Sequence, residues 1–140
     1  MKRNLLSSIL ALMLGAAPLI IAGPALADGI KVMLSGSQEV PPVNTSATGS
    51  GTVTVNADMT VSANITTTGI AATAAHIHIA PAGQNGPVIV PFTKNGDAWV
   101  AAPGAKFTEA QYAAYKVGNT YVNVHSAAIP AGEIRAQIRP

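Results

Sequence analysis

The sequence of 140 residues contains no cysteine. This absence excludes disulfide bonds, thiolate metal ligands, thiol nucleophiles and redox exchange between cysteine pairs. A blue-copper electron-transfer site is excluded as well, because such sites use a cysteine thiolate. The fold must therefore be held by an apolar core, with or without help from a bound metal ion.

Charged residues are also few, at 10% of the sequence. Two of them, Lys2 and Arg3, belong to a predicted leader, and without these two the chain has six basic and six acidic residues. Nucleic acids and anionic membranes are bound by clustered Lys and Arg side chains. Because this balanced charge provides no basic stripe, we expect no nucleic-acid partner.

Residues 1–27 have the layout of a Sec-type signal peptide, with cleavage expected after Ala27. A positive start, a long apolar run and small residues before the cleavage site follow in order, at Lys2-Arg3, residues 5–21 and Ala25-Leu26-Ala27. An uncleaved membrane anchor is the alternative, since the apolar run is marginally long enough to span a bilayer. Gly15 and Pro18 interrupt the run, so cleavage is favoured.

Cleavage would leave residues 28–140 as one mature domain, without a stable membrane span and in a periplasmic or secreted location. That length is sufficient for a single apolar core. The sequence leaves open whether the domain binds a protein partner or pairs with a second copy.

Short apolar stretches separated by turn residues fill the predicted domain. Strands are expected at residues 30–34, 52–55, 61–65, 75–79, 88–92, 98–100, 121–125 and 134–138. Such a pattern is typical of an antiparallel β-sandwich or barrel. One short helix is predicted at residues 108–116, because Thr108 and Gln111 have the spacing of a capping box.

The three histidines of the chain are His76, His78 and His125. Alternate residues of a strand share a face, so His76 and His78 point the same way. His125 shares a face with Asn123 on its own strand. If the two strands are neighbours, the three imidazoles can meet at one ion.

Neutral imidazole binds copper, zinc and nickel, and copper(II) has the highest affinity among them. Three histidines and a water would also suit a catalytic zinc ion, whereas calcium and magnesium prefer oxygen ligands. Binding would weaken below about pH 6.5, where imidazole becomes protonated. The simpler interpretation is that the histidines are solvent-facing strand residues without a ligand.

Other polar residues could surround such a site. Tyr121 and Asn123 are expected to lie just outside the metal ligands. Glu133 and Arg135 are two apart on a strand, and they are either a surface pair or groups that support the metal ligands or guide an anion. Glu39 stands before two prolines that end an edge strand, and a ligand role for it is not favoured. Catalytic residues are not predicted, because no nucleophile elbow is present.

Six motifs in order resemble the CHRD domain family, which is named after chordin and occurs in many exported bacterial proteins. They are Leu34-x-Gly36-x-Gln38-Glu39-Val40-Pro41-Pro42, Ala47-Thr48-Gly49, Ala75-His76-Ile77-His78, Asn85-Gly86-Pro87-Val88, Tyr121-Val122-Asn123-Val124-His125-Ser126 and Gly132-Glu133-Ile134-Arg135. The resemblance covers residues 30–138 and implies a domain outside the cytoplasm. It also implies an antiparallel Greek-key β-sandwich, and the three histidines match those characteristic of the family.

The His-x-His strand is also similar to the copper-binding strand of copper,zinc superoxide dismutases. That similarity implies a copper-dependent dismutase as one alternative, with Arg135 in the role of an anion-guiding arginine. The chain departs from those enzymes, since it has no fourth histidine, no histidine-rich zinc loop and no disulfide. The leading prediction is a protein that holds or handles one copper ion without turnover, with zinc as the alternative ion. A metal-free structural or protein-binding module is the other alternative.

Overall fold

The computed structural model describes residues 19, 21, 23 and 26–140. The predicted signal peptide lies almost entirely outside the described residues, so its cleavage and the export of the protein stay predictions. No helix in the described part of the chain is long and apolar enough to cross a membrane.

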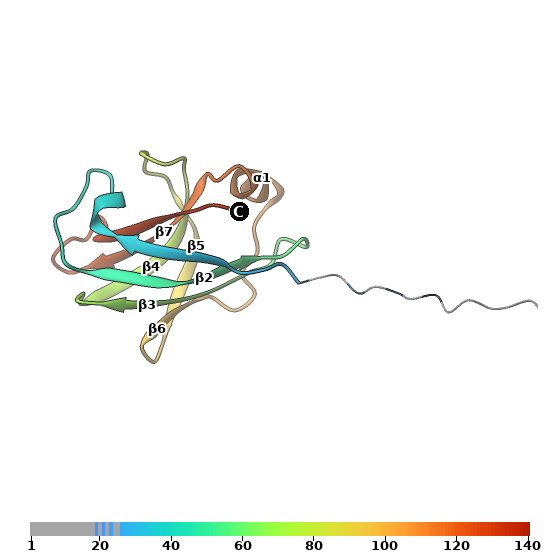
Figure 1. The fold of residues 1–140 in the computed structure, drawn as a ribbon, viewed down its shortest axis with the longest axis horizontal. Coiled ribbons are helices and arrows are strands. Elements are labelled where there is room, and N and C mark those ends of the chain that lie inside the picture. Colours follow the sequence, from blue (N-terminus) through green and yellow to red (C-terminus); the bar gives the residue numbers. More distant parts are fainter. Residues whose placement is uncertain (1–18, 20, 22, 24–25) are drawn as a thin grey trace, which may run out of the picture.

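Eight strands, one short 3-10 helix and one α-helix build the domain (Figure 1). In chain order they are β1 (Ile30–Ser35), η1 (Gly36–Gln38), β2 (Thr48–Val55), β3 (Val61–Thr68), β4 (Ala72–Ile79), β5 (Val88–Asn95), β6 (Ala98–Ala101), α1 (Glu109–Lys116), β7 (Thr120–Ser126) and β8 (Ile134–Ile138). Every predicted strand is present, and several are longer than expected. The capping box of Thr108 and Gln111 starts α1, as predicted.

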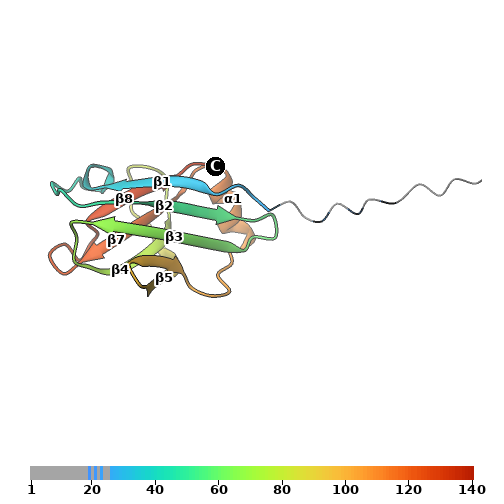
Figure 2. The same ribbon diagram turned by 60° about the horizontal axis from the view of Figure 1, so that its bottom comes forward.

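The predicted Greek-key sandwich is wrong, because the eight strands close into one antiparallel barrel. The order around the barrel is β1-β2-β3-β6-β5-β4-β7-β8, and Figures 1 and 2 show the strands wrapping around a common interior. β3 pairs with β6 over Asn64–Thr66. The seam that closes the barrel joins the first strand to the last, β1 to β8, through the single register pair Ser35 and Arg135. An alternating strand pattern suits a sandwich and a barrel equally, since each needs one apolar face.

Aliphatic side chains from all around the barrel fill its interior. Val53, Ile65, Ile77, Val122 and Ile134 are each 0% exposed. Phe107 and Tyr115, the latter from α1, belong to the same core. Because this core is close-packed and apolar, it fixes the strands whose outward side chains form the candidate site.

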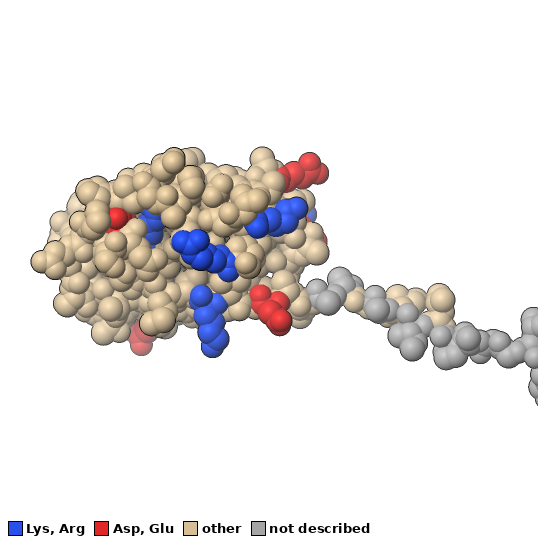
Figure 3. Space-filling view, turned by 45° about the horizontal axis from the view of Figure 1, so that its top comes forward, with Lys and Arg blue, Asp and Glu red and all other residues tan. Residues whose placement is uncertain are grey.

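The outer face of the barrel is covered along part of β4, β7 and β8. Tyr121, Asn123 and Arg135 alternate with the core residues of their strands, yet they are only 1–3% exposed. On β2 and β3 the outward residues are mostly exposed threonine, serine and asparagine. On the face drawn in Figure 3, the Lys and Arg side chains are scattered among uncharged residues. Polar groups are thus buried outside the core on one side of the barrel, which is where the histidines lie.

Candidate metal centre

β4 and β7 are antiparallel neighbours, and this pairing brings the three histidines to one face. In register, His76 lies opposite Asn123 and His78 lies opposite Tyr121. His125 follows Asn123 by two residues, so it shares the outward face of β7. The residues between them point into the barrel and belong to the core.

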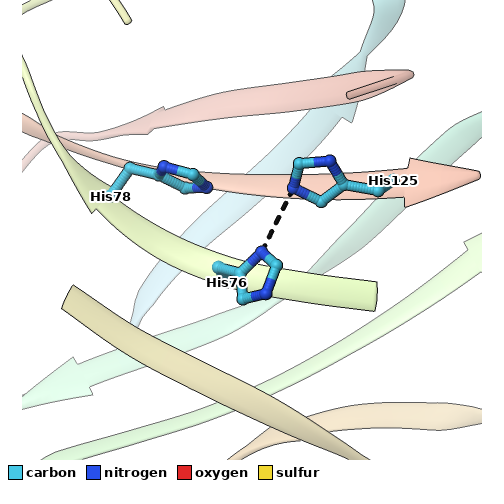
Figure 4. A group of neighbouring side chains, drawn as sticks. All are labelled: His76, His78 and His125. Carbon is cyan, nitrogen blue, oxygen red and sulfur yellow. Dashed lines mark hydrogen bonds between the residues drawn. The ribbon is translucent and has the colours of Figure 1, made fainter. Parts of the chain in front are cut away.

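The three imidazoles lie close enough together to share one ion (Figure 4). Each ring offers one nitrogen, and these nitrogens all lie within 4.8 Å of one another. The shortest separation is 3.1 Å, between His76 Nδ1 and His125 Nε2. Two imidazole nitrogens on one four-coordinate ion are about 3.0–3.4 Å apart, given metal–nitrogen bonds of about 2.0–2.1 Å. This pair already has the spacing of two ligands, and the third nitrogen needs a shift on the order of 1 Å.

Backbone carbonyls orient two of the rings. His78 Nδ1 lies 2.9 Å from the carbonyl oxygen of Gly86, and His125 Nδ1 lies 2.8 Å from that of Pro130. A carbonyl oxygen can only accept, so each Nδ1 carries the proton and each Nε2 keeps a free lone pair. Metal-ligating histidines are commonly held by this kind of hydrogen bond.

The free lone pairs meet inside the cluster. His78 Nε2 is buried and has no hydrogen-bond partner among the described residues. When no ion is bound, His125 Nε2 accepts a hydrogen bond from the N–H of His76 Nδ1, because the proton of His125 is on its own Nδ1. A buried nitrogen without a partner is unfavourable, and a metal ion would satisfy it. The donor set therefore fits a transition metal that prefers nitrogen ligands.

Burial keeps two of the imidazoles neutral. It is the main cause that lowers the pKa of His76 to about 4, and the charges of His125 and His78 lower it further. Burial also lowers the pKa of His78, although the hydrogen bond to Gly86 acts in the opposite direction. Since a metal ion binds neutral imidazole, protons compete less at these two residues than at an ordinary histidine. We therefore expect His76 and His78 to remain neutral, and able to bind a metal ion, at pH values somewhat below 6.5.

A stack of side chains extends from His78 on the side away from His76 and His125. The Tyr121 ring is parallel to the His78 ring, with 4.8 Å between centroids and 6° between planes. The guanidinium carbon of Arg135 lies 3.4 Å from the Tyr121 centroid. β4 and β8 flank β7 on opposite sides, so His78 and Arg135 cover opposite faces of Tyr121. Arg135 is thereby separated from the histidines by the Tyr121 ring.

The other two predicted neighbours make their hydrogen bonds elsewhere. Asn123 Nδ2 donates to Glu39 Oε1, and Thr45 Oγ1 donates to Glu133 Oε1 at 2.7 Å. Sequence reasoning did not identify Glu39 as the partner of Asn123. It also missed the orienting carbonyls of Gly86 and Pro130. A carbonyl partner leaves no mark in side-chain patterns, and the only signal was the Asn85-Gly86-Pro87 motif.

A comparison with protein families fits this arrangement. The model of the CHRD domain family matches residues 30–138. The chain belongs to the CHRD family. No curated protein and no solved structure matches the chain. The CHRD domain runs from the start of β1 to the end of β8, and it includes all three histidines.

A substitution of Gly86 tests how His78 is held in the CHRD domain. A Cβ atom on residue 86 would lie 1.8 Å from the carbonyl oxygen of Ile79, so Gly86→Ala must displace the loop. We expect the affinity for copper(II), measured by calorimetric titration, to fall about 10- to 100-fold. Gln84→Ala in the same loop is the control, because its side chain is exposed and its backbone can keep the same conformation. Equal affinities of the two variants would show that the Gly86 carbonyl does not position His78.

Glu39 should make the stability of the CHRD domain depend on pH. Burial raises its pKa to about 7, against the charge of Arg135 and hydrogen bonds from Val40 and Asn123. The folded protein keeps this proton between pH 4.5 and about 7, where the unfolded chain loses it, so stability falls as the pH rises through that window.

Glu39→Gln removes this titration. We expect the variant to be more stable than the wild type by about 1–2 kcal/mol at pH 8, allowing for solvent screening. Near pH 4.5 the difference should vanish. Urea unfolding of the metal-free proteins at the two pH values measures it, and a difference that does not change with pH would contradict the account.

Proposed function

We propose that this CHRD domain binds one copper ion through His76, His78 and His125 and holds or hands on the metal without turnover. The observation that carries the proposal is the convergence of three imidazole nitrogens within 4.8 Å. The orientation of two rings by carbonyls supports it further. So does the buried Nε2 of His78, which has no hydrogen-bond partner within the described residues. An all-nitrogen set without thiolate suits copper(II), which heads the affinity order of the divalent metals.

Zinc is the alternative ion for the same ligands, with a water molecule in the fourth position. Titration of the metal-free protein with each ion tests the choice. We expect one copper(II) per chain, and we expect copper to displace zinc. Displacement of copper by zinc would contradict the copper assignment, and no uptake of either ion would contradict the site itself.

The surroundings of Arg135 favour metal holding over superoxide dismutation. A guiding arginine must attract the anion toward the metal from solvent. Arg135 is 1% exposed, and the ring of Tyr121 lies between it and His78. We expect the copper-loaded protein to consume superoxide no faster than free copper, and a faster rate would favour the enzyme.

Export is part of the proposal. The layout of residues 1–27 supports it. N-terminal sequencing of the protein isolated from the periplasm or culture medium tests it. We expect a chain that begins at Asp28, whereas a chain that begins at Met1 would contradict cleavage.

A further inference from the structure

A hollow lies beside Arg135, on the side of Tyr121 that faces away from the histidines. It has a volume of about 440 Å³, and its walls come from η1, the loop that follows η1, β8 and the turn after β4. This volume is within the range of small-molecule sites. The three histidines do not line this hollow, which we call the Arg135 cleft. It is therefore separate from the candidate metal centre.

Arg135 is a buried cation whose hydrogen bonds go to neutral groups. Its guanidinium donates to Asn85 Oδ1 and Gln137 Oε1, each at 3.2 Å, and it lies 3.5 Å from the carbonyl oxygen of Pro81. The residue is 1% exposed. A buried charge without an opposite charge close to it is unfavourable by several kcal/mol. An anion in the cleft would supply that charge.

The acidic residue in the wall of the cleft, Glu39, compensates this charge only in part. Its carboxylate oxygen accepts a hydrogen bond from Asn123. Burial raises the pKa of Glu39 to about 7, so near neutral pH a large share of the molecules carry no charge there. Arg139 is exposed and adds a second guanidinium to the wall. The cleft as a whole is positive.

The remaining wall of the cleft includes apolar side chains. Val40, Pro42 and Ala82 line it together with the two arginines. Guanidinium groups bind the paired oxygens of a carboxylate through parallel N–H donors. Apolar walls favour a ligand that buries hydrocarbon against them. The combination matches a molecule with one carboxylate and a small apolar body.

We propose that the Arg135 cleft binds small organic carboxylates. Arg139, which is exposed, contacts the carboxylate, and Val40 and Pro42 contact the apolar body. Arg135 is buried and contributes the positive charge of the wall without direct contact. The site shares none of its lining residues with the metal ligands, so it does not depend on the proposed function.

An NMR titration of the metal-free protein with hexanoate tests the proposal. We expect saturable shifts of backbone amides confined to the cleft walls, in residues 37–42, 82–83 and 135–139. Arg139→Gln should weaken binding about tenfold or more, because a charge-assisted hydrogen bond is lost. Lys94→Gln is the matched control, since it removes an exposed positive charge on β5, outside the cleft.

Three comparisons decide the outcome. Equal weakening by Arg139→Gln and Lys94→Gln would overturn the proposal, because hexanoate would then respond only to overall charge. Inorganic phosphate that binds as tightly as hexanoate would also overturn it, because the apolar wall would contribute nothing. His125→Ala should leave hexanoate binding unchanged while it removes metal uptake, so failure of one site can be told from failure of the other.

Discussion

Replacement of His78 by alanine is expected to lower the affinity for copper(II) at least about 100-fold. Loss of a residue that merely orients a ligand costs about 10- to 100-fold, and His78 is itself a ligand in this account. Its Nε2 is buried and has no hydrogen-bond partner in the part of the chain that the structure describes, and alanine offers no nitrogen in its place. Calorimetric titration of the metal-free variant measures the change.

Two further variants serve as controls for this result. His125→Ala should cause a similar loss, and His125 is less buried than His78, so its removal disturbs the packing less. Met33→Ala removes a sulfur that copper could bind, and Met33 is 78% exposed on β1. We expect Met33→Ala to bind copper as the wild type does. Wild-type uptake by either histidine variant would contradict the site.

Copper is expected to raise the midpoint of thermal unfolding by about 10 °C when its free concentration is 100 times Kd. A ligand that binds only the folded state adds about 2.7 kcal/mol at that concentration. In a domain of this size, 1 kcal/mol corresponds to about 4 °C. Binding of copper to histidines of the unfolded chain would reduce the shift.

The same measurement separates a metal protein from a metal-free module. His78→Ala, scanned with and without copper, should show no more than a small change in the unfolding midpoint. If the midpoint of the wild type also does not respond to copper, the histidines are ordinary strand residues. A structural or protein-binding role would then be favoured.

Local structure could be predicted from the sequence because it depends on neighbouring residues. Alternating apolar residues determined the strands, and the spacing of Thr108 and Gln111 determined the start of α1. The closure of the barrel could not be predicted in this way. It depends on which edges pair, and the seam between β1 and β8 consists of the single pair Ser35 and Arg135.

The candidate site, like the fold, could be predicted from the sequence only in part. Alternation within β4 and β7 was enough to place the three histidines on outward faces, and their meeting needed only the pairing of these strands. The groups that hold the rings come from loops whose conformation no periodic pattern encodes. Gly86 and Pro130 contribute backbone carbonyls. Glu39 is 84 residues away from its partner Asn123 in the sequence.

The most direct test of the metal centre is the structure of copper-loaded crystals, with anomalous diffraction at the copper absorption edge. We expect one anomalous peak per chain, about 2.0–2.1 Å from His76 Nδ1, His78 Nε2 and His125 Nε2. A peak at another position, or none in crystals grown with excess copper, would contradict the account.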